Sequence, residues 1–131
     1  MIQIDLKNMA EALIIIEQTL ADFGDTLPQD TNYKAMFVCE EILTNLQRHA
    51  DFENRIPSVT LSLESIEEQG LQLIFKDNSQ AFNLLDFPDP DINAGLEERE
   101  AGGLGIFLTK KYAKALQYNY ENTYNMLKII L

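Results

Sequence analysis

The segment Glu98–Ala113, EREAGGLGIFLTKKYA, carries three of the chain's six glycines within four positions, directly before an apolar pattern with helical spacing. The first turn of a helix presents unpaired backbone N–H groups and carries about half a positive charge. Glycines there let the backbone approach an anion closely and adopt positive φ angles. We therefore expect Gly102, Gly103 and Gly105 to form a phosphate cradle at the start of a helix over 104–116. The alternative interpretation is an ordinary loop-to-helix junction with flexible glycines.

The stretch 78–100, which leads to these glycines, shows no sustained periodicity. Its segment DFPDPDINAGLEERE, residues 86–100, contains six acidic residues and a single basic one, Arg99. A segment of this length without regular structure is usually functional or disordered in a small domain. Because its carboxylates would repel a bound polyphosphate, we expect them to point outward, toward a partner.

The rest of the chain shows two hydrophobic periodicities. Helical spacing of apolar residues predicts helices over 9–23, 31–50 and 104–116. Alternation of apolar and polar residues predicts strands over 2–6, 59–63 and 71–76, with a turn at Gly70 and two further strands within 116–131 that join near Asn122 and Thr123. This order predicts an α+β sandwich, with helices on one face of a mixed, mostly antiparallel sheet.

Length and charge limit the function. The chain has 131 residues and a formal net charge of −11, which predicts a single domain over 1–131. Such an acidic chain is a poor partner for nucleic acid or anionic membrane. A phosphorylated ligand would need backbone dipoles or a metal ion to hold it locally. No apolar run approaches the roughly 20 residues of a membrane span and no signal sequence opens the chain, so we expect a cytoplasmic protein.

The sequence CEEILTNLQRHAD, residues 39–51, repeats polar residues every four positions, at Glu41, Asn45 and His49. At this spacing they share one side of the helix, next to its apolar stripe. A carboxylate and an amide one turn apart could position a hydroxyl or water and ligate Mg²⁺. The alternative is a polar helix edge. For His49 the two interpretations are a place near a phosphate and a helix-end histidine that caps carbonyls.

The sequence IFKDNSQAFN, residues 74–83, places Asp77 at the end of an apolar strand. A carboxylate in that position can accept a hydrogen bond from an exocyclic amine. The alternative interpretation is an ordinary Asp-Asn-Ser turn.

Together these features resemble the GHKL ATP-binding superfamily. The similarity lies in Glu-x-x-x-Asn on a helix, Asp at a strand end, a long lid over about 78–101, and Gly-Gly-Leu-Gly before a helix. The chain is most similar to the branch of anti-sigma factor serine kinases, across nearly its whole length. That similarity includes the PDPD sequence of the lid, the GGLGIFL helix start and an Asn before the last strand, Asn125.

This resemblance implies a Bergerat-type fold that binds Mg-ATP between the helices and the lid. It assigns the general base to Glu41, Mg²⁺ to Asn45 and the adenine amine to Asp77. The same resemblance assigns the phosphates to the residues around the third helix start, with two cations as charge partners: Gly102, Gly103, Leu104 and Gly105, with Arg99 or Lys110.

The resemblance also implies the partners. The substrate would be a serine or threonine of an anti-sigma antagonist with an STAS-like fold, and a sigma factor would be bound when the antagonist is phosphorylated. Such proteins are usually homodimers, and the first strand and helix often contribute to the interface.

The chain departs from the family pattern at two places. The Asp-x-Gly-x-Gly box appears as DNSQA, with Ser79 and Ala81 in place of glycines, and Lys128 matches the threonine of the last strand. These departures support the alternative of a catalytically weak or inactive, nucleotide-gated binding regulator. A third hypothesis, the ATPase part of a two-component histidine kinase, is disfavoured because no phosphoacceptor helix pair precedes the domain.

Overall fold

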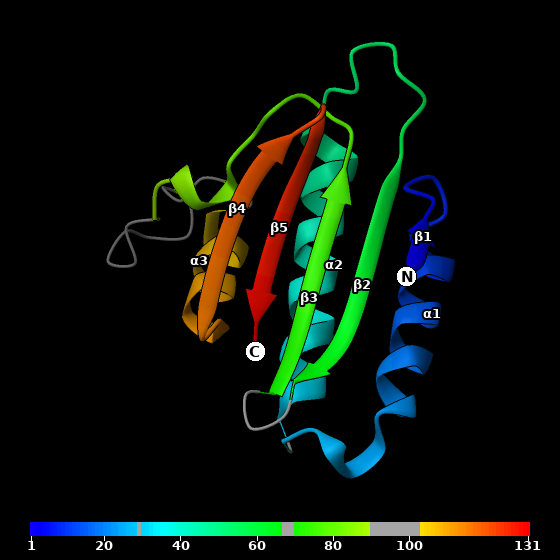
Figure 1. Ribbon diagram of the computed structural model, residues 1–131, viewed down its shortest axis with the longest axis vertical. Helices are drawn as coiled ribbons and strands as arrows, with labels where there is room; N and C mark the ends of the chain where they lie inside the picture. The colour runs from blue at the N-terminus through cyan, green and yellow to red at the C-terminus, as the bar shows by residue number, and fades with distance from the viewer. Residues whose placement is uncertain (29, 67–69, 90–102) are drawn as a thin grey trace.

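The computed structural model describes residues 1–28, 30–66, 70–89 and 103–131. Within these residues three α-helices lie on one face of a five-stranded sheet, as Figure 1 shows. The helices are α1 (Met9–Asp22), α2 (Thr31–His49) and α3 (Gly103–Tyr112), and two short 3₁₀ turns are η1 (Gly24–Thr26) and η2 (Leu84–Asp86). The predicted α+β sandwich with helices on one face is confirmed.

The strands run in the spatial order β1-β2-β3-β5-β4. Their bounds are Ile2–Ile4 for β1, Val59–Ile66 for β2, Gly70–Asp77 for β3, Ala115–Glu121 for β4 and Tyr124–Ile130 for β5. Each of the four strand pairings is antiparallel, so the described sheet contains no parallel pair, and the expectation of a mixed sheet was wrong in that respect. The reason is that β4 and β5 form a hairpin that joins the β2-β3 hairpin through an antiparallel β3-β5 pair.

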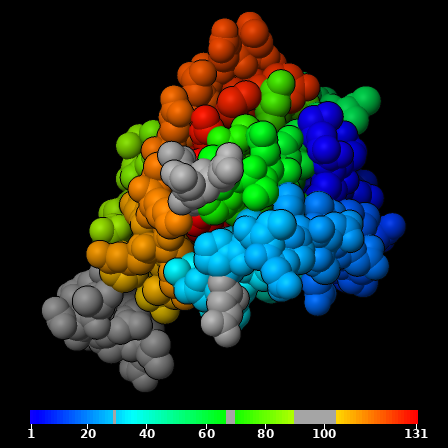
Figure 2. All heavy atoms as spheres, turned by 60° about the horizontal axis from the view of Figure 1, so that its bottom comes forward, coloured from blue at the N-terminus to red at the C-terminus, as the bar shows by residue number. Residues whose placement is uncertain are grey.

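The core lies between the sheet and α2, the central helix, which contacts both α1 and α3. In the space-filling view of Figure 2, α1 and the segment leading into α2 lie on one side of the helix layer and α3 on the other. Alternate residues of β3 and β5 face this layer, as their period of two requires. Among them Phe75 and Ile129 are at most 2% exposed, and they belong to the same buried cluster as Val38 and Leu43 of α2.

Positive φ angles at two places in the sheet explain which residues stand there. Asn122 and Thr123 both have positive φ angles, of 54° and 67°, at the predicted junction of β4 and β5. Two such residues give a turn whose twist matches that of the flanking strands. Gly70 has φ +98°, and a Cβ there would lie 2.3 Å from the carbonyl oxygen of Leu131. Only glycine fits this position, which is the first residue of β3 opposite Ile66, while the connecting residues 67–69 lie outside the described residues.

The third helix is shorter than predicted. It ends at Tyr112 instead of Leu116, and β4 begins at Ala115. Leu116 lies opposite Ile129 in the β4-β5 ladder and packs against the core cluster. Pairing with β5 therefore overrides the helical spacing that continues through this residue.

Candidate functional site

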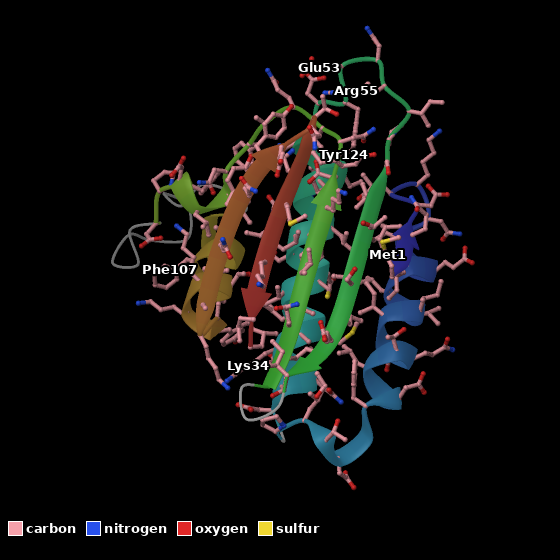
Figure 3. The ribbon with its side chains drawn as sticks, viewed as in Figure 1. Met1, Lys34, Glu53, Arg55, Phe107 and Tyr124 are labelled. Atoms are coloured by element: carbon pink, nitrogen blue, oxygen red, sulfur yellow. The ribbon has the colours of Figure 1, made fainter. Side chains whose placement is uncertain are left out.

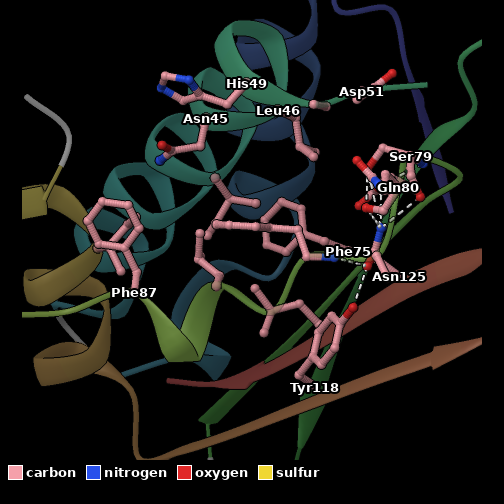
Figure 4. A pocket seen from close by; sticks show the side chains of 18 residues that line it. Asn45, Leu46, His49, Asp51, Phe75, Ser79, Gln80, Phe87, Tyr118 and Asn125 are labelled. Atoms are coloured by element: carbon pink, nitrogen blue, oxygen red, sulfur yellow. Dashed lines mark hydrogen bonds between the residues drawn. The ribbon is translucent and has the colours of Figure 1, made fainter. Parts of the chain in front are cut away.

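A cavity of about 410 Å³ lies between the helix layer and the ends of β3 and β5. This volume is within the usual range for small-molecule sites. Most of its wall is apolar, and the residues of that wall include Ile42, Leu46, Phe75, Phe87, Ile106 and Leu127. Figure 4 shows polar side chains at two ends, with Asn45 and His49 on α2 at one end and Ser79, Gln80 and Asn125 at the other.

The β3 end of the cavity is organised around Asp77, which is only 6% exposed. Its Oδ1 accepts hydrogen bonds from the backbone N–H of Ser79 at 3.0 Å, from the Ser79 hydroxyl, and from Nδ2 of Asn125 at 3.0 Å. Within the described residues Oδ2 of Asp77 has no hydrogen-bond donor. A buried acceptor without a partner beside a cavity suits a ligand amine, as the sequence predicted for Asp77.

The amide of Asn125 has one possible orientation. Its Oδ1 accepts from the backbone N–H of Phe82 at 3.0 Å and from the hydroxyl of Tyr118. Its Nδ2 faces only acceptors or shared hydroxyls, including the carbonyls of Ser79 and Gln80, both at 3.2 Å. Since a backbone N–H can only donate, the oxygen must face Phe82. Burial raises the pKa of the Tyr118 hydroxyl, so it remains a donor at neutral pH.

The altered box after Asp77 is held by side chains and by a neighbouring loop. The Asn78 side chain accepts from the backbone N–H of Ser58 at 2.8 Å and donates to the carbonyl of Ile56 at 3.0 Å. The N–H of Gln80 donates to the carbonyl of Asp51 at 2.7 Å. This α2-β2 loop includes Glu53 and Arg55, which form an ion pair at 3.4 Å and are labelled at the top of Figure 3. The segment with Ser79 and Ala81 in place of the two glycines is therefore tied to the α2-β2 loop by hydrogen bonds.

Beside the Asn45 end of the cavity, α2 and α3 bring together Glu41, Asn45 and Gly105, of which Asn45 alone is among the residues that line the cavity. Nδ2 of Asn45 donates to Oε1 of Glu41 at 3.1 Å and to its carbonyl at 2.8 Å. The Glu41 carboxylate lies directly against Gly105, where a Cβ would be 2.0 Å from its Cδ and 2.2 and 2.3 Å from its two oxygens. Gly105 thus gives the carboxylate room at the first turn of α3. From the sequence we predicted that Gly105 binds phosphate, and we did not predict its contact with the Glu41 carboxylate.

Asn45 could hold a magnesium ion. Its hydrogen bonds use Nδ2, and in the part of the chain that the structure describes its Oδ1 has no donor. The same part contains no cluster of three His, Cys, Asp or Glu side chains placed to bind a metal ion. Magnesium is commonly bound through one or two protein oxygens together with waters and substrate phosphates. These residues therefore fit Mg²⁺ that arrives with a nucleotide, and they do not form an all-protein metal cage.

The remaining predicted site residues lie either on α3 or outside the described residues. Gly103 begins α3, and Leu104 follows it with 38% of its surface exposed. Lys110 donates to the carbonyl of Phe87 at 2.8 Å and lies 3.3 Å from the Asp89 carboxylate, so it links α3 to the segment after η2. Arg99, Gly102 and the predicted lid beyond Asp89 lie outside the described residues.

Lys128 does not line this cavity. Alternation along β5 puts it on the sheet face opposite the helices, paired with Ile74 and Gln117. The inward residue of β5 at the Asp77 end is Asn125, which lies directly opposite Asp77 in the ladder. The match of Lys128 to the family threonine was therefore wrong, because Lys128 lies on the sheet face away from the cavity. A shift of one residue along a strand is enough to move a side chain to the other face.

Tyr118 and Phe82 were not predicted as site residues from the sequence, and Asn125 entered only through the family resemblance. One signal for Asn125 was present in the sequence. It is the polar member of an alternating series whose other members are Leu127, Ile129 and Leu131. A polar residue in a buried series needs a hydrogen-bond partner.

Comparisons with known proteins agree with the fold. Residues 2–131 match the family model described as the histidine kinase-like ATPase domain. A similar solved structure is the histidine kinase domain of the blue-light activated histidine kinase EL346 from Erythrobacter litoralis, with a TM-score of 0.57 and 17% identity. The alignment covers 96% of this chain and 58% of that chain. At this identity the likeness shows the fold alone.

The search of curated proteins found no match. Among the described helices, none combines the length and apolarity that crossing a membrane requires. The family model extends over almost the whole chain. This chain therefore belongs to the histidine kinase-like ATPase family of the GHKL superfamily and carries its ATP-binding domain.

Proposed function

We propose that this chain is an Mg-ATP-dependent serine/threonine protein kinase that acts as an anti-sigma factor in the cytoplasm. It phosphorylates an anti-sigma antagonist with an STAS-like fold, and it sequesters a sigma factor when that antagonist is phosphorylated. The observation that carries the kinase proposal is the Glu41 carboxylate, held by Asn45 against the first turn of α3.

Nucleotide binding follows from the two ends of the cavity. The apolar wall, with Phe75 and Leu127, accommodates a purine ring, and Asp77 accepts a hydrogen bond from its exocyclic amine. The phosphates would extend toward Asn45 and the N-terminus of α3, where backbone N–H groups favour negative charge. Mg²⁺, when bound there, neutralises charge on the phosphates, and Asn45 supplies a protein oxygen for it.

Glu41 is the proposed general base. Its hydrogen bond from Asn45 uses Oε1, which orients the carboxylate and leaves Oε2 to accept the proton of an incoming serine or threonine hydroxyl. Phosphoryl transfer depends mainly on alignment and charge neutralisation, so a fixed carboxylate at this point is enough to select and orient the hydroxyl. No described residue other than Glu41 combines a carboxylate with contact to both Asn45 and Gly105.

Surface features support a protein-binding role. The net charge of −11 favours a partner with a basic surface. On the first helix, Ile14 is 55% and Ile15 37% exposed, and Met1, which precedes the edge strand β1, is 91% exposed. Apolar residues in these positions support the proposed homodimer through β1 and α1.

An inactive, nucleotide-gated regulator is the second candidate, and the loss of both box glycines favours it. Ser79 nevertheless contributes two donors to Asp77, and the Glu41–Asn45 pair is intact. The kinase is therefore the better-supported proposal.

Incubation of the purified chain with γ-labelled ATP, Mg²⁺ and candidate STAS-domain proteins tests the proposal. We expect many turnovers per chain and phosphate on one serine or threonine, with no label on a substrate in which that residue is alanine. Stoichiometric sigma-factor binding without any transfer would favour the inactive regulator. Absence of both transfer and sigma binding would overturn the anti-sigma proposal.

A further inference from the structure

We propose that Asn125 is a positioning residue that sets the base selectivity of the cavity by fixing the Asp77 carboxylate. Asn125 is 4% exposed and lies opposite Asp77 on the adjacent strand. The inference rests on nucleotide binding, which the proposed function also requires, and it deepens that function by naming what makes Asp77 selective.

Every polar group of the Asn125 side chain is occupied by the protein. Oδ1 accepts from the Phe82 N–H and the Tyr118 hydroxyl. The two hydrogens of Nδ2 are shared among Oδ1 of Asp77 at 3.0 Å and oxygens of Ser79 and Gln80 at 3.2 Å. Asn125 therefore has no donor or acceptor left to contact a base. Its influence on a nucleotide must pass through Asp77.

The hydrogen bonds to Asp77 all converge on one oxygen. Asn125 and the N–H and hydroxyl of Ser79 donate to Oδ1, and in the described chain none donates to Oδ2. Three donors on one oxygen fix the rotation of the carboxylate. They leave Oδ2 as the acceptor for a ligand.

A fixed acceptor discriminates between purines. Adenine presents an exocyclic amine, which donates to Oδ2, whereas hypoxanthine presents a carbonyl oxygen at the same position, which repels a carboxylate. A site that aims a buried hydrogen-bonding group at its ligand rejects an analogue that cannot pair with it. When the carboxylate can rotate, this distinction weakens because Oδ2 is no longer held in one direction.

Ser79 also helps to fix the Asp77 carboxylate. It replaces a glycine of the family box, and its hydroxyl adds a donor to Oδ1 that glycine would lack. The departure from the family pattern is therefore matched by an added hydrogen bond to Asp77.

The test measures binding of Mg-ATP and Mg-inosine triphosphate by calorimetry to the wild-type chain and to Asn125→Ala, with Asn119→Ala as control. Asn119 is exposed on β4, and its position on the strand puts it on the opposite sheet face. We expect Asn125→Ala to lower ATP affinity about 10- to 100-fold, the effect of losing a hydrogen bond to a charged group. Inosine triphosphate affinity should change less, so the ratio of the two affinities falls about 10-fold. Asn119→Ala should leave the ratio unchanged.

A second variant keeps the test decisive if Asn125→Ala does not fold. Ser79→Ala removes only the hydroxyl donor to Asp77 and leaves the Asn125 bonds in place, and we expect the ratio of ATP affinity to inosine triphosphate affinity to fall about 3- to 10-fold in the folded variant. An unchanged ratio in a folded Asn125→Ala, or in Ser79→Ala where the first variant is unfolded, overturns the inference. A wild-type chain that binds both nucleotides equally also overturns it.

Failure of the kinase proposal is distinguishable from failure of this inference. Binding is measured without any protein substrate, so a chain that binds ATP selectively but transfers no phosphate would refute only the kinase activity. A wild-type chain that binds no ATP would refute both.

Discussion

The two ends of the cavity are built differently. At the β3 end, Asp77, Ser79, Tyr118 and Asn125 form a dense hydrogen-bond network, in which both polar groups of the Asn125 amide are used. At the α2 end, Asn45 donates only to Glu41, and the nearby Glu41 and Asn45 oxygens Oε2 and Oδ1 have no donors within the described residues.

This difference matches two chemical tasks. A purine ring is rigid and is recognised by a fixed acceptor, so the β3 end can be formed before the ligand arrives. Phosphates and Mg²⁺ must be accommodated by oxygens and N–H groups that remain unpaired until they bind. Substitutions at the β3 end should therefore change affinity and selectivity, while substitutions at the α2 end should change catalysis and metal dependence.

The largest effect is expected for Glu41→Gln. The amide keeps the shape of the side chain but cannot act as a base, so kcat for phosphate transfer to the protein substrate should fall about 10²- to 10⁴-fold. ATP affinity should stay within about 3-fold, because Asp77 and the apolar wall are unchanged. Single-turnover transfer and calorimetric binding measure the two quantities.

Glu40→Gln is the matched control, since it makes the same change at the neighbouring, exposed glutamate. It should transfer phosphate at the wild-type rate. Full activity of Glu41→Gln would remove Glu41 as the base and with it the proposed division between the two ends.

The next effect concerns the metal. In a chain with net charge −11, the triphosphate needs Mg²⁺ to be held, so chelation with EDTA should weaken wild-type ATP binding by at least about 10-fold. Asn45→Ala should bind Mg-ATP more weakly and show a smaller difference between Mg²⁺ and EDTA. If wild-type affinity is the same with and without EDTA, the assignment of Asn45 to the metal is incorrect.

A smaller and more specific effect links Glu41 to Gly105. In the wild-type background, the Cβ of Gly105→Ala displaces the Glu41 carboxylate from its hydrogen bond with Asn45, so the stability that alanine normally adds to a helix should be offset by about 0.5–1.5 kcal/mol, the contribution of that bond. In a Glu41→Ala background the same substitution should stabilise the chain by about 0.5–1 kcal/mol, since alanine favours helix over glycine. Denaturant unfolding of the four variants gives the coupling energy. Additive effects would show that the contact is absent in solution.

The smallest effect is expected from Tyr118→Phe at high pH. Burial raises the pKa of the Tyr118 hydroxyl above its ordinary value of about 10. The folded state therefore holds this proton more tightly than the unfolded state, and wild-type stability should decline as pH rises above about 10. Tyr118→Phe has no such proton, so its stability should fall less steeply over that range. Equal slopes in urea unfolding between pH 9 and 11 would contradict this.

The site was partly predictable from local spacing. Glu41 and Asn45 lie one helical turn apart, so their hydrogen bond follows from helix geometry once the helix is recognised. The position of Asp77 at the end of a strand was likewise predictable from the local sequence pattern. By contrast, the bond from Asn125 to Asp77 joins residues 48 positions apart, and it depends on the pairing of β3 with β5. No local period specifies that pairing.

Two predictions failed for the same physical reason. The helix over 104–116 was extended too far because Leu116 fits a helical stripe as well as a strand, and its place opposite Ile129 decides between them. Lys128 was matched to a binding position because a motif comparison gives no register. A register shift of one residue moves a strand side chain to the other sheet face, and only the pairing with neighbouring strands determines the register.

The sequence by itself determined the elements, the face of α2 that carries Glu41 and Asn45, and the glycine-rich start of α3, because these follow from local periodicity and backbone freedom. Only the tertiary structure decided that Glu41 fills the space beside Gly105, that Lys110 binds Phe87 and Asp89, and that Asn125 faces Asp77. These contacts join segments distant in sequence, and their geometry is set by strand register and by the packing of α3 on α2.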